Sequence, residues 1–138
     1  MFEATRVTGL GKGPKTSGLL SPEGQGATLS AMAELWSLAN EQGAQQVVAL
    51  ATMAARLASN TSQFLDAAAR QETPVRVLSG EDEARYGFLA VAHDPLFQSD
   101  QRVSTVDVGG HSTEIVTADR QDTGWDVRFH RSFPIGAL

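Results

Sequence analysis

The chain has 138 residues with 11 basic and 16 acidic side chains, and its net charge of −5 argues against non-specific nucleic-acid binding, which requires a basic surface. With 41% hydrophobic residues, it is expected to fold as one average domain or as two small parts of a larger one, and disorder is not expected. It contains no cysteine, so a disulfide framework and a thiolate metal site are excluded.

The first half of the chain alternates short strands with helices. Residues 2–10 alternate weakly between apolar and polar side chains, which predicts a short strand. The segment Ser21-Pro22-Glu23 has the order of an N-cap, a first-turn proline and a first-turn acid, so it predicts a helix start. Two short apolar runs, residues 46–51 and residues 74–78, predict buried strands. A helix that starts near Asn60 is predicted between them.

A further helix is predicted from Ser79, and the pattern changes after about residue 100. Three strands joined by tight turns are expected there, at residues 102–107, 113–118 and 125–132. The order of elements predicts an α/β layer with parallel strands, followed by antiparallel strands. The change in pattern predicts two parts, 1–98 and 99–138.

The most informative segment runs from Val106 to Val116, where an apolar strand leads into Asp107, a Gly-rich turn, Glu114 and a second strand. Successive backbone N–H groups in such a turn can form an anion-binding concavity. The two flanking carboxylates supply the oxygen ligands that a divalent cation prefers. Phosphate chemistry is one interpretation of the segment, and a β-hairpin with a Gly-rich turn is the other.

Two further clusters carry candidate site residues. Ser79 and Asp82 fit a capping box, which explains the first acids of the predicted helix but explains Glu83 less well. A carboxylate at Glu83 could take a proton from an attacking water. Arg56 follows a predicted strand, where ligands bind in open α/β sheets, although an ordinary surface arginine is the alternative.

The ends of the chain and its hydropathy bear on where the protein acts. The first residues lack the basic region and apolar run of a signal peptide. No apolar stretch approaches the roughly 20 residues of a membrane span. A cytoplasmic protein without a membrane partner is therefore expected.

Six segments of the chain occur in the order typical of the Ppx/GppA family, the exopolyphosphatases and guanosine pentaphosphate phosphohydrolases. These segments are residues 10–13, 20–23, 51–56, 79–85, 106–114 and 134–137. The chain resembles that family over nearly its whole length. The resemblance implies an α/β fold, a partial actin-like (ribonuclease H-like) domain with parallel strands and helices, followed by the opening antiparallel strands of a second similar domain.

The resemblance also implies roles for matching residues. Glu83 matches the glutamate that acts as base toward the attacking water, and Arg56 matches an arginine that contacts phosphate. The remaining matches form a phosphate loop with metal-binding carboxylates beside it: Gly109, Gly110, His111 and Ser112 for substrate, and Asp107 and Glu114 for metal. The implied reaction is hydrolysis of a terminal phosphoanhydride of polyphosphate or guanosine pentaphosphate, with Mg²⁺ or another divalent cation.

The chain departs from the family pattern in two respects. His111 stands where the family usually has a third glycine. The family's opening Asp-x-Gly-Ser-Asn-Ser loop has no counterpart, so the chain resembles a fragment that lacks the first hairpin. We therefore expect the isolated chain to be inactive or nearly so. An exposed strand edge near residues 47–50 is expected to drive self-association.

Two other functions on the same fold are compatible with the sequence. One is a non-catalytic module that senses polyphosphate or guanosine tetraphosphate, which His111 and the missing loop motivate. The other is a kinase-like phosphotransferase, against which the segment 79–85 argues. Binding without hydrolysis would indicate the first, and nucleotide-dependent phosphotransfer the second.

Overall fold

The structure, a computed structural model, describes residues 2–137 and contains two compact units, one ending at Val77 and the other beginning at Leu78. Helix α5 (Gly80–Ala92) therefore groups with the C-terminal strands. The predicted boundary between residues 98 and 99 concerns the two domains of the larger fold, and it stays a prediction.

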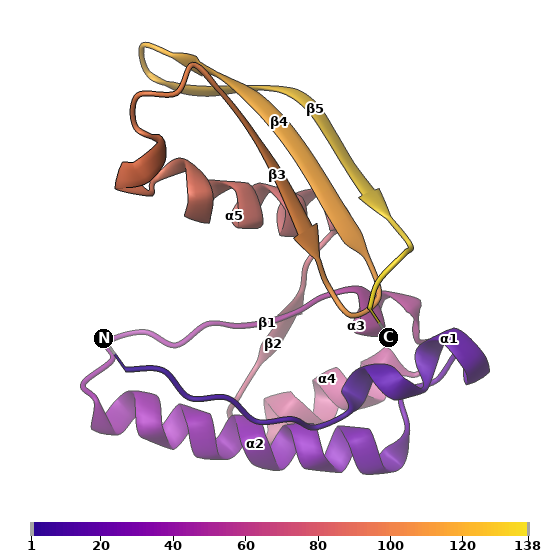
Figure 1. Ribbon diagram of the computed structural model, residues 1–138. Helices are drawn as coiled ribbons and strands as arrows, with labels where there is room; N and C mark the ends of the chain where they lie inside the picture. Colours follow the sequence, from indigo (N-terminus) through magenta and orange to yellow (C-terminus); the bar gives the residue numbers. More distant parts are fainter. Residues whose placement is uncertain (1, 138) are drawn as a thin grey trace. The chain divides into compact units, whose positions relative to one another are not determined.

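The first unit begins with two short helical segments, followed by a long helix (Figure 1). They are η1 (Leu10–Lys12), α1 (Pro14–Ser17) and α2 (Pro22–Glu41). The predicted start of α2 is confirmed, because Oγ of Ser21 accepts a hydrogen bond from the amide of Gly24 at 3.0 Å. This bond satisfies one of the amide groups that a helix N-terminus leaves without an intrahelical partner.

The remaining elements of the first unit are two strands and two helices. They are β1 (Ala49–Ala51), α3 (Met53–Leu57), α4 (Thr61–Arg70) and β2 (Val75–Val77). Strands β1 and β2 pair in parallel, with Ala49 opposite Val75, so the predicted parallel pairing is confirmed. Asn60 precedes α4 without a capping bond from its side chain, and its amide group instead binds the backbone of Leu20.

The predicted strand at residues 2–10 is wrong. Residues 2–9 form no regular element, and η1 starts at Leu10. A strand requires a neighbour to complete its hydrogen bonds, and no described strand pairs with this segment. Instead, side chains attach it to α2, through an ion pair between Arg6 and Glu34 and a 2.8 Å hydrogen bond between Thr28 and Thr8.

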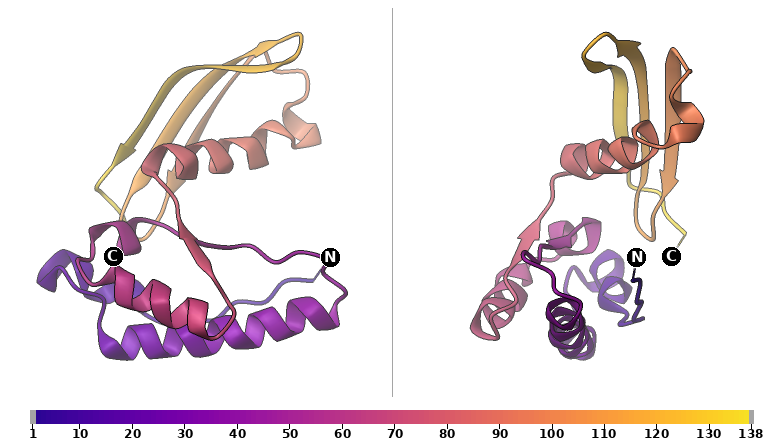
Figure 2. Two further views of the ribbon diagram at one scale, coloured as in Figure 1. Left: turned by 180° about the vertical axis from the view of Figure 1, so that it is seen from behind. Right: turned by 90° about the vertical axis from the view of Figure 1, so that its left-hand side faces the viewer.

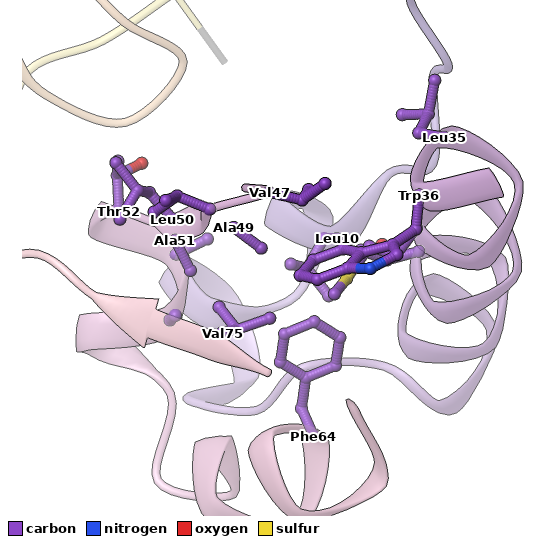
Figure 3. A pocket seen from close by; sticks show the side chains of 15 residues that line it. Leu10, Leu35, Trp36, Val47, Ala49, Leu50, Ala51, Thr52, Phe64 and Val75 are labelled. Atoms are coloured by element: carbon purple, nitrogen blue, oxygen red, sulfur yellow. The ribbon is translucent and has the colours of Figure 1, made fainter. Parts of the chain in front are cut away.

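The core of the first unit is small and adjoins an apolar cavity of about 430 Å³ (Figure 3). Leu20, Ala58 and Phe64 are its buried residues. The cavity extends from Phe64 past the ring of Trp36 to the inner side of β1. Val48, just before β1, and Leu50 within it also line the cavity and are exposed.

The second unit is a three-stranded antiparallel sheet with one helix across a face (Figure 2). Its elements are α5, η2 (Pro95–Phe97), β3 (Arg102–Val108), β4 (Thr113–Gln121) and β5 (Gly124–Phe133). The strand order is β3–β4–β5, which confirms the three strands predicted after residue 100. A register shift between Thr117 and Ala118 interrupts the pairing of β4 with β5.

One face of this sheet packs on α5, and the four-residue spacing of apolar side chains on α5 explains which residues form the core. Ala84, Phe88 and Ala92 recur every four residues on the helix and are buried against the sheet. The buried residues of the sheet are Val103, Val116 and Ala118. Among residues 2–137, no helix has the length and apolar character that crossing a bilayer requires.

Candidate active site

The Gly-rich segment forms the tight turn between β3 and β4. The amide of Gly109 donates a 2.9 Å hydrogen bond to the carbonyl oxygen of Ser112, which closes the turn after the last strand pair. Within residues 2–137, the amides of Gly110, His111 and Ser112 donate no backbone hydrogen bond. Successive backbone N–H groups that have no backbone acceptor can bind an anion.

The C-terminal segment supports this turn from one side. The amide of Ala137 donates to the carbonyl oxygen of Gly109 at 3.0 Å, and Oγ1 of Thr113 donates to the carbonyl oxygen of Ile135 at 2.6 Å. Gly136 lies so close to the peptide between Gly110 and His111 that a methyl group on it would overlap that peptide. The shape of the turn therefore depends on residues more than 20 positions further along the chain.

Asp107 and Glu114 lie opposite each other at the end of the β3–β4 pair, so their side chains share one face of the sheet. Glu114 is only 2% exposed, and its Oε1 atom accepts a 2.7 Å hydrogen bond from Oγ of Ser132 on β5. Residues of the same face further along β4 are buried against α5. Both carboxylates thus point toward the helix that carries Glu83.

Helix α5 brings Glu83 near this pair. Its start is fixed by Ser79, whose Oγ atom accepts from the amide of Asp82 at 3.0 Å. Glu83 and Gly87 lie four residues apart on one helix face, about 6 Å along the axis. A methyl group on Gly87 would lie 3.4 Å from Oδ2 of Asp107, so the Asp107 carboxylate lies one turn from Glu83. The Oε2 atom of Glu83 is buried.

A cavity of about 350 Å³ lies between α5 and the strands, and Asp107 and Glu114 form part of its wall. Among residues 2–137, no group of three or more histidine and acidic side chains is arranged to hold one metal ion. A Mg²⁺ ion needs less from the protein, because it is commonly held by one or two carboxylates together with water and substrate phosphates. A pair of carboxylates beside an anion-binding turn fits that requirement.

Arg56 belongs to the first unit, in the last turn of α3. Its Nη2 atom lies 3.5 Å from Sδ of Met53. The helix follows β1 directly, as expected of a ligand-binding position beyond a strand end. The role of Arg56 toward phosphate stays a prediction, as do the roles of the other site residues.

Sequence reasoning missed three residues that shape this site. Ser132 binds Glu114 across the sheet, Gly87 packs beside Asp107, and Gly136 leaves room for the turn. Gly87 had a signal, because a glycine inside a helix costs stability and suggests a close approach. His111 is buried, at 7% exposure, which the sequence did not predict.

Comparison with known proteins identifies this class of protein. The model of the Ppx/GppA phosphatase family matches residues 1–138. A crystal structure of the Aquifex aeolicus member of the Ppx/GppA family is 36% identical, with a TM-score of 0.82, and the match covers 99% of this chain and 43% of that one. An exopolyphosphatase from Cytophaga hutchinsonii ATCC 33406 is 27% identical, with a TM-score of 0.82 over 94% of this chain and 40% of that one.

The chain belongs to the Ppx/GppA phosphatase family. Its fold is accordingly a partial actin-like α/β fold, with the parallel strands and the antiparallel sheet that the sequence predicted. The chain spans less than half the length of the solved structures that it matches. A crystal structure of the type II variant of the Aquifex aeolicus Ppx/GppA phosphatase is 34% identical, with a TM-score of 0.79. That match covers 99% of this chain and 44% of the other.

Proposed function

We propose that this chain carries the catalytic base and one phosphate loop of a phosphohydrolase that cleaves the terminal phosphoanhydride of polyphosphate or guanosine pentaphosphate. The observation that supports it most is the position of Asp107 one helical turn from Glu83 and opposite Glu114. The adjoining turn supports the proposal too, because the amides of Gly110, His111 and Ser112 make no backbone hydrogen bond within residues 2–137 and can donate to an anion. Membership of the Ppx/GppA family supports the reaction class.

In the proposed mechanism, Glu83 accepts a proton from water as the water attacks the terminal phosphorus in line. The amides of Gly110, His111 and Ser112 donate to the phosphate oxygens, where negative charge develops. Asp107 and Glu114 would hold a divalent cation, which would neutralise negative charge on the phosphate. Ser132 fixes Glu114 through its hydrogen bond, so the carboxylate keeps one orientation.

The test is phosphate release from long-chain polyphosphate and from guanosine pentaphosphate by the protein in its native full length, with Mg²⁺. The Glu83→Gln variant is expected to lose activity by about 10²-fold or more, the usual contribution of a general base. Glu81→Gln is the matched control, because Glu81 is an exposed acid in the first turn of the same helix. Equal activity of Glu83→Gln and wild type would contradict the proposal.

The second candidate is a sensor that binds the same anions without hydrolysing them. Its motivation is His111, a buried side chain inside the turn at the place of a family glycine. Calorimetry with polyphosphate and guanosine tetraphosphate separates the two functions. Tight binding without phosphate release from the full-length protein would favour the sensor, and His111→Gly is then expected to restore space in the turn.

A further inference from the structure

A second cavity of the C-terminal unit contains none of the predicted site residues. It has a volume of about 640 Å³ and lies between the C-terminal half of α5 and the hairpin of β4 and β5. Ligand pockets commonly enclose about 300–1,000 Å³ and combine an apolar wall with a few converging polar groups. The lining of this cavity has both features.

The apolar wall is built around a pair of aromatic rings. The rings of Phe88 and Trp125 are nearly perpendicular, at 86°, and their centroids lie 5.5 Å apart. Edge-to-face packing of this kind fixes both rings. Leu89, Ala92 and Val127 complete the apolar part of the wall. Trp125 is only half-buried, so part of its ring faces the cavity.

Arginine side chains supply the polar part. The guanidinium of Arg120 lies 4.2 Å from the centroid of the Trp125 ring. Its Nε and Nη2 atoms donate to the carbonyl oxygens of Asp100 and Phe97, each at 2.9 Å. These bonds hold the planar fork in place, and no residue within 2–137 accepts from Nη1. The exposed side chain of Arg85 lines the cavity from α5.

His93, at the end of α5, lines the cavity together with the two arginines and adds an imidazole. Its Nδ1 atom lies 2.9 Å from the carbonyl oxygen of Leu89, which can only accept, so Nδ1 carries the proton and Nε2 is the remaining ring nitrogen. None of the residues that line the cavity is acidic, although the chain as a whole has a net charge of −5. The two arginines therefore give this cavity a local excess of positive charge.

We propose that this cavity binds a planar aromatic anion of nucleotide size, with its ring on the wall formed by Phe88 and Trp125 and its anionic group at Arg85 and Arg120. The guanidinium of Arg85 can present parallel donors to phosphate or carboxylate, and Nη1 of Arg120 adds a further donor beside the two nitrogens that bind backbone. The apolar wall suits a ring and gives inorganic phosphate nothing to pack against. The inference does not depend on the proposed hydrolysis, because it uses other residues.

Calorimetric titration of the protein with adenosine monophosphate tests the proposal. The buffer contains a chelator, so that binding dependent on a divalent cation does not contribute. Saturable binding is expected, whereas adenosine, which lacks the charge, and inorganic phosphate, which lacks the ring, should bind at least about tenfold more weakly. Quenching of Trp125 fluorescence in a Trp36→Phe variant should follow the same curve, because the chain has two tryptophans.

Arg85→Gln should weaken binding at least about tenfold, since it removes a charged donor from an exposed position. Arg128→Gln is the matched control, because Arg128 is an exposed arginine of the same unit that pairs with Asp126 at 2.9 Å. Circular dichroism confirms that both variants fold. Absence of saturable binding, equal binding of inorganic phosphate, or equal effects of the two variants would overturn the proposal.

Discussion

Gly136 shapes the turn at residues 109–112 from outside. It belongs to the segment after β5, and it lies against the peptide between Gly110 and His111. The backbone bond from Ala137 to Gly109 holds this segment in place. A side chain at position 136 would have to displace backbone, which is costly because backbone cannot rotate away as a long side chain can.

Gly136→Ala is therefore expected to lower the free energy of unfolding by about 1–3 kcal/mol, the usual cost of overpacking. Urea unfolding measures this change. Gly26→Ala is the control, because Gly26 lies within α2 with open space around it. That substitution should be neutral or stabilise the protein by up to about 1 kcal/mol, since alanine favours a helix. Equal stability of Gly136→Ala and wild type would contradict the close packing.

At the residue scale, the candidate catalytic and metal-binding residues could be predicted from the sequence. The residues that position them could not. Asp107, Glu114 and Glu83 were candidates because their residue types suit the reaction, and the structure brings them to facing elements of one unit. Ser132 was not predictable, because its contact with Glu114 depends on the register of β4 with β5. Register across a sheet is a long-range property, which local patterns do not contain.

At the element scale, β3 and β4 are joined by an ion pair at the end far from the turn. Arg102 stands opposite Asp119 in the register and donates to both of its carboxylate oxygens. Arg128 on β5 lies 3.6 Å from the same carboxylate. The hydrogen bond from Arg102, aided by the charges of Arg102 and Arg128, lowers the pKa of Asp119 below its ordinary value.

A lowered pKa in the folded state makes the stabilisation by Asp119 dependent on pH. It is present above the unfolded pKa, about 3.9, and is lost as the pH falls through the folded value. Asp119→Asn should therefore be less stable than wild type at pH 7, and the difference should shrink as the pH falls below about 4. Urea unfolding at several pH values measures this difference in the free energy of unfolding.

Asp122→Asn at the exposed turn between β4 and β5 is the control, and it should show little difference at any pH. A difference between Asp119→Asn and wild type that stays constant from neutral to acid pH would contradict the proposed role of the carboxylate charge.

Elements with a local signal were predicted well, and those that need a partner were not. Helix α5 starts at Ser79 because its capping bonds lie within four residues, which the sequence displays directly. Residues 2–10 alternate like a strand, yet no neighbour among the described residues completes one. Helix α3 was not predicted, since it has only five residues and Thr52 makes no capping bond from its side chain.

At the scale of the whole molecule, β1 and the residue before it expose apolar side chains. Strand β1 pairs with β2, and no other described strand adjoins it. Val48 is 62% and Leu50 43% exposed, and the apolar cavity of Figure 3 lies on the inner side of the strand. Residues 42–55 include no charged side chain, so two copies would meet here without electrostatic repulsion.

We therefore predict that the chain self-associates through β1, by antiparallel pairing of two copies about a twofold axis. Light scattering coupled to size exclusion should give a mass above the 14.7 kDa of one chain, rising with concentration. Val48→Lys should return the mass toward 14.7 kDa, because edge lysines oppose strand pairing. Val7→Lys, at a position 97% exposed outside this strand, should leave association unchanged. A mass of one chain at every concentration would contradict pairing, and association unaffected by Val48→Lys would place it at another surface.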